Sequence, residues 1–421
     1  MSLHSLRALL MAFIAALLVS ACGGSTSSSN TPPPPAEGIS LVPGDSQVTV
    51  TWKETPGVEY WIFAAPNSSN LSLTNWLSTT GSTYRLKATS PFVYTGLAND
   101  TPYSFFLTGR VNSGPGGAAT PTVIATPRLA GNTWTSGTTL STGSPTSLAY
   151  GSYVDTATNT YVYSYLAVGK GGSLFKASSI DAWTAIPSIV TSDLRASTAG
   201  VAKFIAAGAG GTVIYSTDTQ TWTQAASVTT QNINAMAASA NLVVAVGDNG
   251  TIIKSSDAVT WTAAATVPSS AHLYGVAMSD SGTWVAVGAA GTILTSTDGN
   301  TWTAQTSGSN VNLRAAGVLT SLVNSSNTYQ FLAVGDSGTI LRSADGITWV
   351  AQTANTTNTL NAVSAINQFL VVGNSSTIIT SSDGITWTQK TSTTQADLKT
   401  LLRAANQYIA VNATGGIISS Q

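Results

Sequence analysis

The sequence predicts an all-β chain in which a small β-sandwich is followed by a seven-bladed β-propeller. Three observations predict this. A segment ending in tryptophan recurs beyond residue 128, with spacings of 39, 39, 41, 47 and 38 residues between aligned tryptophans. A period near 40 with β-rich segments is typical of four-stranded propeller blades rather than of helical arrays. Residues 38–128 instead show short alternating strands without this repeat, which indicates a sandwich.

Composition excludes several classes of function. Only 8% of the 421 residues are charged and the net charge is -1, so the basic stripe of a nucleic-acid binder is missing. His4 and His272 are the only histidines, and Cys22 is the only cysteine. A zinc site or a Ser-His-Asp triad would therefore depend on His272. We expect no metal and no cofactor.

The N-terminus predicts a targeting signal over residues 1–21. Arg7 precedes an apolar stretch, Ala8 to Leu18, which is shorter than the roughly 20 residues of a membrane-spanning helix. Val19-Ser20-Ala21-Cys22 then resembles a bacterial lipobox. The resemblance implies cleavage before Cys22 and lipidation of this cysteine. An ordinary secretory signal with an incidental cysteine is the alternative.

Residues 22–37 are rich in Ser and Pro and predict a tether, because such a segment cannot bury a core. Gly23 follows the cysteine, whereas an aspartate there is associated with retention in the inner membrane of enteric bacteria. We therefore expect a lipid-anchored protein of the bacterial cell envelope, in the outer membrane. The side of that membrane that it faces stays open.

Residues 38–128 form the predicted sandwich. Val48, Val50 and Trp52 alternate with threonines, a second strand covers residues 60–63, and Tyr103 begins another alternating run after the turn at residues 99–102. These features, with the closing Gly-Pro-Gly-Gly at 114–117, resemble a fibronectin type III domain. The resemblance implies a tyrosine corner at Leu97 and Tyr103. We expect this domain to act as a spacer.

Residues 129–421 form the predicted propeller. A clear copy of the repeat reads GDSGTILRSADGITWV over residues 335–350. We expect four strands per blade: an inner strand such as 313–316, then 329–335, 339–342, and an outer strand at Thr348-Trp349. Aspartate should cap the backbone N–H groups of the turn before the outer strand, and glycine should accept its positive φ.

The signature Ser-x-Asp-x-x-Thr-Trp in this turn resembles the Asp box of sialidase-type propellers. It occurs five times, at Asp218, Asp257, Asp298, Asp345 and Asp383. The resemblance implies that these aspartates are structural and lie away from any active centre.

The blade count depends on both ends of the repeat region. The last repeat stops after residues 416–419 without an outer strand, and residues 131–136 read as an outer strand with nothing before it. Six complete repeats plus one blade made from these two fragments give seven. The N-terminal strand would then close the last blade and leave no open sheet edge there.

The same residues argue against an enzyme. Sialidases use a tyrosine nucleophile assisted by glutamate, yet all three glutamates of this chain precede the propeller. The Arg-Ile-Pro motif of that family is also absent from the chain. A hydrolase would have to draw two acids from the few aspartates outside the turns.

In the form of its repeat, the region from 131 to 421 is more similar to photosystem II assembly factors of the Ycf48 and HCF136 type. Both have a Gly-x-x-Gly-x-Ile third strand followed by Ser/Thr-x-Asp-Gly-x-x-Trp. The resemblance implies a seven-bladed scaffold that binds protein. The sandwich and the tether depart from that family, so we carry over the architecture and not the client.

One set of residues predicts a binding site. Aligned Leu-Arg-Ala triplets place an arginine on three inner strands, which line the axis of a propeller: Arg195, Arg314 and Arg403. Other blades place different residues at this point: Asn234, Tyr274, Asn361 and Ala149. Arginine binds carboxylates with two parallel hydrogen bonds. These side chains could hold a peptide carboxylate or an acidic glycan. They could also pair with carbonyls or aspartates of the ring.

We therefore predict a non-catalytic envelope protein whose propeller binds a protein. A glycan-binding, adhesin-like module is the alternative, and a sialidase-like hydrolase is a second one. A glycan binder should present aromatic side chains on one face, for which Tyr150, Tyr274 and Tyr329 are the candidates.

Overall fold

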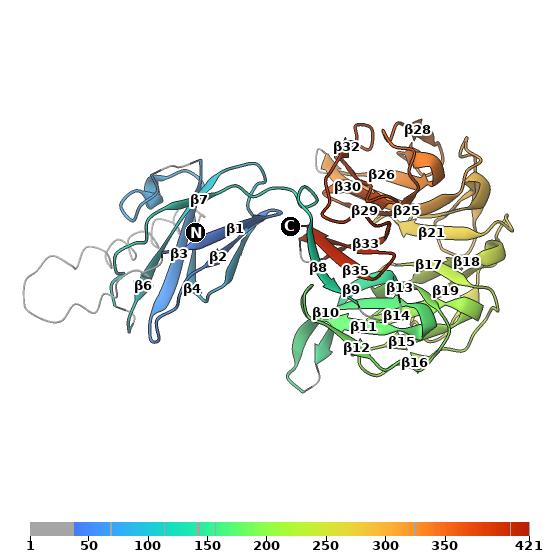
Figure 1. Cartoon of the computed structure of the whole chain (residues 1–421), viewed down its shortest axis with the longest axis horizontal. Coiled ribbons are helices and arrows are strands. Elements are labelled where there is room, and N and C mark those ends of the chain that lie inside the picture. Colours follow the sequence, from blue (N-terminus) through green and yellow to red (C-terminus); the bar gives the residue numbers. More distant parts are fainter. Residues whose placement is uncertain are drawn as a thin grey trace, which may run out of the picture. The chain divides into compact units, whose positions relative to one another are not determined.

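The computed structural model describes residues 38–420 except 68–69, 113, 141–143, 156, 324–325 and 405. The predicted signal, the tether and Cys22 lie outside the described residues. The chain divides into two compact units between Ala130 and Gly131 (Figure 1). Both units are built from β-strands with a few single-turn 3-10 helices. No helix among the described residues is long and apolar enough to cross a membrane.

The smaller unit contains two antiparallel sheets. The first has the order β1-β2-β5, with β1 at Ser40–Gly44, β2 at Gln47–Thr51 and β5 at Phe92–Thr95. The second has the order β4-β3-β6-β7, with β4 at Thr83–Ala88, β3 at Glu59–Pro66, β6 at Tyr103–Arg110 and β7 at Val123–Ala125. The 3-10 helix η1 spans Trp76–Ser78.

The core of this unit follows from the alternation seen in the sequence. Val48, Val50 and Trp52 are buried, and Trp52 packs edge-on against Tyr60 at 5.6 Å. Between β5 and β6, the backbone N–H of Ala98 donates a hydrogen bond to the hydroxyl of Tyr103, at 3.1 Å. A tyrosine at the start of a strand that bonds back to the upstream backbone is the arrangement of a tyrosine corner.

The larger unit contains seven four-stranded sheets among its described residues, here called blades, and the fold is a β-propeller. The inner strands are β9 (Pro145–Asp155), β13 (Leu194–Gly200), β17 (Ile233–Ala238), β21 (Leu273–Met278), β25 (Leu313–Val323), β29 (Leu360–Ile366) and β33 (Leu398–Ala404). Each inner strand contacts the inner strand of the next blade, and β33 contacts β9, which closes the ring.

The remaining strands follow outward from the axis. The second strands are β10 (Thr160–Gly169), β14 (Lys203–Gly208), β18 (Val243–Gly247), β22 (Trp284–Gly288), β26 (Ser326–Gly335), β30 (Gln368–Gly373) and β34 (Gln407–Asn412). The third strands are β11 (Leu174–Ala177), β15 (Val213–Ser216), β19 (Ile252–Ser255), β23 (Ile293–Ser296), β27 (Ile340–Ser343), β31 (Ile378–Ser381) and β35 (Gly416–Ser420). The outer strands are β12 (Trp183–Ile186), β16 (Thr223–Gln224), β20 (Thr262–Ala263), β24 (Thr303–Gln305), β28 (Val350–Gln352), β32 (Thr388–Gln389) and β8 (Thr135–Thr139).

In five blades a 3-10 turn joins the second and third strands. The last residue of this turn is glycine, because a larger residue would collide with the neighbouring backbone. These turns are η2 (Lys170–Gly172), η3 (Ala209–Gly211), η4 (Asp248–Gly250), η5 (Ala289–Gly291) and η6 (Asp336–Gly338). Gly211 has a φ of 71°, and a Cβ there would lie 1.9 Å from the carbonyl oxygen of Thr229. Only glycine combines this positive φ with so close an approach of two backbones.

The aspartate turns are held by a repeated set of hydrogen bonds. Asp345 Oδ1 accepts from the backbone N–H groups of Ile347 and Thr348, both at 2.8 Å, and from the hydroxyl of Ser343 at 2.9 Å. The indole N–H of Trp349 donates to the carbonyl of Gly346 at 3.0 Å. Because tryptophan belongs to this turn, the outer strand begins at Val350 and not at the predicted Thr348.

The last blade is made from both ends of the unit. β8 pairs antiparallel with β35, so the closing strand spans 135–139 rather than the predicted 131–136. The backbone N–H of Gly131 donates to Ser420 Oγ at 2.8 Å, as Gly346 donates to Ser343 and Gly384 to Ser381 within single turns. A hydrogen bond between distant residues thus replaces the continuous turn of the other blades.

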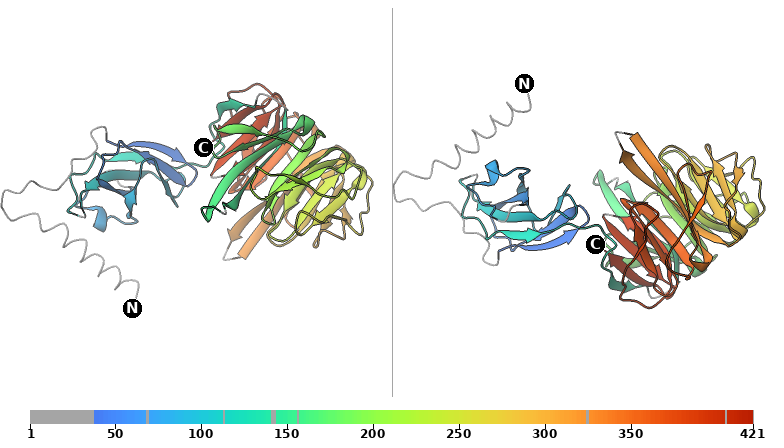
Figure 2. Two further views of the ribbon diagram at one scale, coloured as in Figure 1. Left: turned by 90° about the horizontal axis from the view of Figure 1, so that it is seen from below. Right: turned by 90° about the horizontal axis from the view of Figure 1, so that it is seen from above.

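Two hairpins are longer than the others. β9 and β10 have 11 and 10 residues, and β25 and β26 also have 11 and 10. Both hairpins project from the same face of the propeller (Figure 2).

Candidate functional site

A β-bulge in every inner strand creates the main polar site. In each blade the first residue of the inner strand pairs with the second strand, but the next inner-strand residue has no partner there, and pairing resumes one residue later. This unpaired extra residue defines the bulge. The extra residues are Thr146, Arg195, Asn234, Tyr274, Arg314, Asn361 and Lys399. Together with Lys170 and Asp193 they line a cavity of about 420 Å³, which we call the mouth pocket.

The structure places five of the six predicted binding residues in the mouth pocket and leaves Arg403 outside it. Lys399 takes the position expected for Arg403, because Leu398 pairs with Asn412 and the bulge follows there. Arg403 lies further along β33, above the ring of Tyr408 at 5.4 Å. In the first blade Thr146 takes the position expected for Ala149, which is buried.

Three pocket residues connect neighbouring blades. Each donates from its side chain to the backbone carbonyl of the first inner-strand residue in the next blade. Thr146 reaches Leu194 at 2.5 Å and Asn234 reaches Leu273 at 3.0 Å. Asn361 reaches Leu398 at 2.7 Å in the same way. These three side chains therefore stabilise the ring, and their polar groups are only partly available to a ligand.

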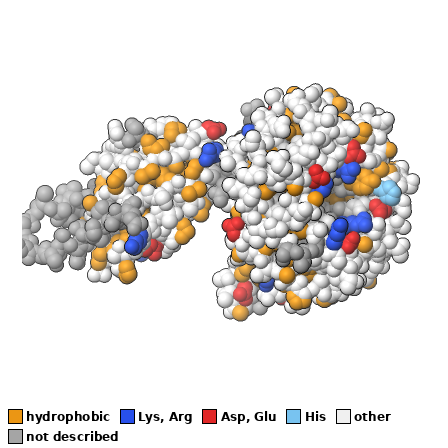
Figure 3. Space-filling view, viewed as in Figure 1, with side chains coloured by type: hydrophobic (Ala, Val, Ile, Leu, Met, Phe, Trp, Pro, Cys, Tyr) orange, Lys and Arg blue, Asp and Glu red, His pale blue; other side chains and the backbone are white. Residues whose placement is uncertain are grey.

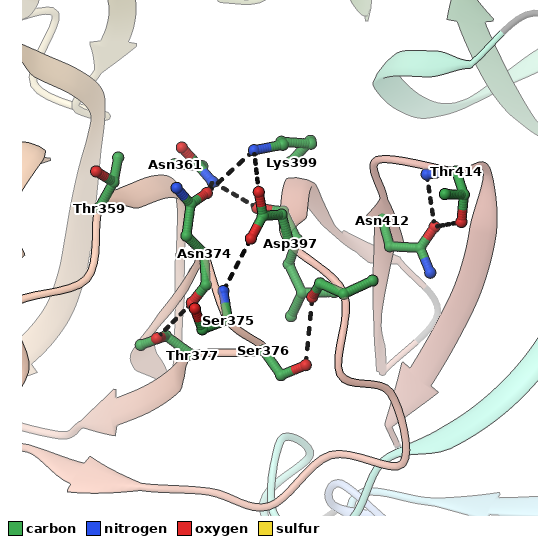
Figure 4. Close-up of polar contacts among 12 residues, drawn as sticks. Thr359, Asn361, Asn374, Ser375, Ser376, Thr377, Asp397, Lys399, Asn412 and Thr414 are labelled. Carbon is green, nitrogen blue, oxygen red and sulfur yellow. Dashed lines mark hydrogen bonds and ion pairs between the residues drawn. The ribbon is translucent and has the colours of Figure 1, made fainter.

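Two of the pocket cations already have carboxylate partners. Arg314 Nε forms an ion pair with Asp336, which follows β26 in the same blade. Lys399 Nζ lies 3.1 Å from Asp397 Oδ2 and 3.0 Å from Asn374 Oδ1 (Figure 4). On this side of the pocket the basic side chains therefore pair with aspartates of the ring, which is one of the two possibilities left open by the sequence.

The other two cations of the pocket, Arg195 and Lys170, have no carboxylate partner at ion-pair distance among the described residues. Arg195 Nη1 donates to Asn234 Oδ1 at 3.2 Å, and within the described ranges neither Arg195 nor Lys170 forms an ion pair. Asp193 lines the same side, and its Oδ1 accepts from the backbone N–H of Gly171 at 2.8 Å. The space-filling view shows charged side chains gathered around the central hollow of a largely uncharged surface (Figure 3).

An aromatic pair borders the pocket. The rings of His272 and Tyr274 lie 6.5 Å apart and nearly parallel. His272 Nδ1 lies 3.2 Å from Asp248 Oδ1. Burial raises the pKa of Asp248, but hydrogen bonds from Asn234 and Asn232 and the nearby His272 outweigh this effect and leave the pKa below its ordinary value.

The described residues contain no group of three or more His, Cys, Asp or Glu side chains that could hold a metal ion. A second cavity, of about 440 Å³, is lined by Asp280 and Asp298. Hydrogen bonds from the backbone of Thr301 and Asn300 lower the pKa of Asp298 to about 2, so this group is an anion at neutral pH. A general acid needs the opposite shift.

The three tyrosines expected to form an aromatic platform lie on three different blades. Tyr274 borders the mouth pocket, whereas Tyr329 packs against the core of the fifth blade and Tyr150 against that of the first. Among the described tyrosines, Tyr161 and Tyr163 are instead the exposed ones, with 73% and 57% of their surface accessible. Their alternation with Tyr165 in the sequence was the signal that could have found them.

No protein-family model matches the chain, and the comparison with curated proteins found no match. Solved structures are similar in fold. A structure of YCF48 bound to a D1 peptide has a TM-score of 0.53 at 16% identity and covers 70% of this chain and 98% of its own. YCF48 from Cyanidioschyzon merolae has a TM-score of 0.52 at 13% identity, covering 68% of this chain and 98% of its own. The WD40 propeller domain of Doa1 has a TM-score of 0.51 at 10% identity, covering 68% and 97%. At these identities the likeness establishes one conclusion, that the chain contains a β-propeller.

Proposed function

We propose that this protein is a non-catalytic, lipid-anchored protein of the bacterial cell envelope, whose seven-bladed propeller binds a segment of a protein partner at the mouth pocket. The observation that carries the proposal is the pocket itself, to which all seven blades contribute one bulge residue. A site assembled from every blade depends on the closed ring and is not a by-product of one loop.

The charges of the pocket indicate what the partner presents. Arg195 and Lys170 lie on adjacent blades and have no ion pair in the described part of the chain, so they can receive a carboxylate of the bound segment. Tyr274, on the fourth blade, offers an aromatic surface in the same pocket. One of the solved structures with a similar fold is YCF48 bound to a D1 peptide, which supports a peptide as the kind of ligand that such a propeller takes.

The rest of the chain supports an envelope location. The lipobox-like sequence ending at Cys22 and the Pro-rich tether support an anchor in the outer membrane. The two-sheet arrangement and the tyrosine corner of residues 38–128 support a fibronectin type III-like spacer. The repeated turn hydrogen bonds support a structural role for the Asp-box aspartates. The low pKa of Asp298 and the absence of glutamate from the propeller sequence support a non-catalytic protein.

The experiment places a photo-crosslinking amino acid at position 274 of the intact protein in its own cells. We expect capture of a defined protein. We expect Arg195→Gln to reduce that capture at least tenfold, because it removes one of the two pocket cations that form no ion pair with the described residues. The matched control is Arg403→Gln, which removes an arginine of an inner strand outside the pocket and should leave capture unchanged. Equal capture with a crosslinker at the exposed rim residue Ile347, or equal loss from both arginine variants, would contradict the proposal.

A further inference from the structure

The longer hairpin of the first blade leaves a strand edge unpaired. β11 ends at Ala177, opposite Tyr165 of β10. The preceding residues of β10, 160–164, pair only with β9 in the described ladders. Because β9 is the inner strand of this blade, the other side of residues 160–164 faces away from the propeller axis. A cavity of about 260 Å³ lies between this side and the end of β11, so space remains beside the strand. We call residues 160–164 the open edge.

Two residues of the open edge direct their backbone groups towards the unpaired side. The N–H of Gly169, further along β10, donates to the carbonyl of Ser173 at 3.0 Å, on the side of β11. Backbone groups alternate between the two sides of a strand, so Tyr161 and Tyr163 point the same way as Gly169. Each tyrosine therefore presents one N–H and one C=O there, and no described strand pairs with them on that side.

The open edge lacks the features that usually protect a strand edge. Charged side chains, proline and β-bulges keep most exposed edges from pairing with other chains. Residues 160–164 read Thr-Tyr-Val-Tyr-Ser, without charge or proline, and their ladder to β9 is regular. Tyr161 and Tyr163 are 73% and 57% exposed, and Val154, opposite Tyr161 on the same face, is 45% exposed. The segment therefore suits pairing with a further strand.

We propose that two copies of the chain associate through their open edges, so that β9 and β10 of each copy form one four-stranded antiparallel sheet. Tyr161 of each copy then lies opposite Tyr163 of the other, and Val162 lies opposite Val162 at a twofold axis. Each Tyr161–Tyr163 pair exchanges two backbone hydrogen bonds, so the outward groups of all four tyrosines are satisfied. A twofold interface uses the same patch on both copies, and this edge is complementary to itself.

The backbone permits one antiparallel register that uses both tyrosines of each copy. A shift by two residues in one direction places Tyr163 opposite Asn159, whose φ of 52° belongs to the hairpin turn. A shift in the other direction places Tyr161 opposite Tyr165, which already pairs with Ala177. A shift by one residue sets outward groups of one copy against residues whose groups point inward.

The side chains favour the same pairing. Cross-strand aromatic pairs stabilise antiparallel strands, and this register gathers four tyrosine rings on one face of the sheet. The ring of Tyr163 is already held nearly parallel to that of Tyr150, with centroids 5.9 Å apart and 16° between the planes. A ring that is ordered before association loses little entropy when the second copy packs on it. The net charge of -1 per chain opposes the association only weakly.

This interface does not depend on the function proposed for the mouth pocket. Thr146, which lines the mouth pocket, is the second residue of β9, whereas the open edge pairs with the far end of that 11-residue strand. At roughly 3.3 Å per residue the two ends of β9 are about 30 Å apart. The two proposals can therefore fail separately.

The first experiment introduces a cysteine at position 162 of the full-length protein and applies mild oxidation. Opposite residues that exchange no hydrogen bonds have Cα atoms about 4.5 Å apart, within the range of a disulfide. We therefore expect Val162→Cys to form a covalent dimer. The matched control is Thr160→Cys, because Thr160 is more exposed than Val162 but its two copies would lie about 13 Å apart along the strand. Both variants keep Cys22, so a disulfide from Cys22 would appear equally in both.

The second experiment measures self-association of the full-length protein by sedimentation equilibrium. We expect the parent protein to dimerise and Val162→Lys to weaken the dimer about tenfold, because it sets two like charges directly opposite each other. The matched control is Ile366→Lys, which adds the same charge at a residue that is 48% exposed on the sixth blade. This control and Arg195→Gln at the mouth pocket should leave the dimer unchanged.

Several outcomes would overturn the proposal. A protein that stays monomeric, or a covalent dimer that forms equally with Val162→Cys and Thr160→Cys, would contradict pairing of the open edges. Equal weakening by both lysine variants would do the same, and loss of the dimer in Arg195→Gln would place the contact at the mouth pocket. Capture of a different protein by Val162→Cys, in place of a second copy, would show that the edge receives a strand of another partner.

Discussion

Single carboxylates organise the rim of the propeller. Asp257, Asp298 and Asp383 each accept two backbone N–H groups of their own turn, and these bonds lower the pKa of each group to about 2. Hydrogen bonds that favour the charged form make the folded state bind a proton less readily than the unfolded chain does. Each such carboxylate therefore links the stability of a blade to pH.

Asp383→Asn tests this link. Its folded pKa lies below the ordinary 3.8, so its contribution is present above about pH 4 and is lost as the pH falls towards 2. We expect the variant to be about 1 kcal/mol less stable at pH 7, a modest value because the group is screened by solvent. The difference from the parent protein should shrink between pH 4 and pH 2. Urea denaturation at each pH measures it.

The control is Asp181→Asn, an exposed carboxylate that lies in the equivalent turn of the first blade but not at the capping position. It should change stability little at any pH. A constant difference between the Asp383 variant and the parent across this range would contradict the electrostatic explanation.

At the level of elements, the last blade joins the two ends of the propeller without a continuous chain, because β8 pairs with β35. Trp134, directly before β8, is 2% exposed, and its indole donates to the carbonyl of Gly131 at 3.0 Å. Gly131 in turn bonds Ser420 at the end of β35. One tryptophan thus supports the turn that is assembled from both ends of the unit.

Trp134→Ala should destabilise the propeller strongly. Truncation of a buried tryptophan costs about 3–5 kcal/mol, and here it also loosens the closing strand. We expect the apparent Tm of the propeller to fall by about 10 °C. Trp302→Ala is the matched control, because Trp302 is also 2% exposed and its indole makes the same bond, to Gly299 at 3.2 Å, in a continuous blade. Thermal unfolding followed by circular dichroism compares them, and equal losses would contradict a special role for the closing strand.

Much of each blade could be predicted, because its turns carry strong local rules. The tryptophan period, the capping aspartate and the glycines at positive φ each occur at fixed offsets from the strands. The exact start of the outer strand was not predictable in this way. The tryptophan looks like a strand residue by propensity, but its indole bonds the carbonyl three residues earlier and keeps it in the turn.

The residues of the mouth pocket were harder to predict, because no residue type in the sequence marks where a β-bulge shifts the pairing of the inner strand with the second strand. Both Leu398-Lys399 and Leu402-Arg403 place an aliphatic residue before a cation, and the ladder selects the first. In the inner strands that begin at Leu194 or later, a polar residue comes directly before the first aliphatic residue. Leu398 fits this rule because Asp397 precedes it, whereas Leu402 does not, because Leu401 precedes it. That feature distinguishes the two alignments. The partner of Arg314 lies in a turn that only the folded blade brings close, whereas Asp397 precedes Lys399 by two residues in the sequence.

At the scale of the whole molecule, the proposed lipid anchor determines where the domains act. Cys22→Ser should release the protein from membranes, because a lipid chain contributes roughly 0.8 kcal/mol of membrane binding per buried CH₂ group. Labelled fatty-acid incorporation and membrane fractionation measure the effect. The matched control is Ser20→Ala, which keeps a small residue before the cysteine and should remain labelled. A Cys22 variant that stays in the membrane fraction would contradict lipid anchoring at this residue.

The pairing of β8 with β35 can form only after the rest of the propeller has been synthesised. Gly131 and Ser420 are 289 residues apart in sequence, so the length-dependent entropy of closing this loop is about 5 kcal/mol. β8 is synthesised before all the blades, yet its partner β35 follows all the other described strands. Contacts of such high sequence separation make folding slow. Until they form, two unpaired sheet edges remain open to other chains, so the window for aggregation lasts until the ring closes.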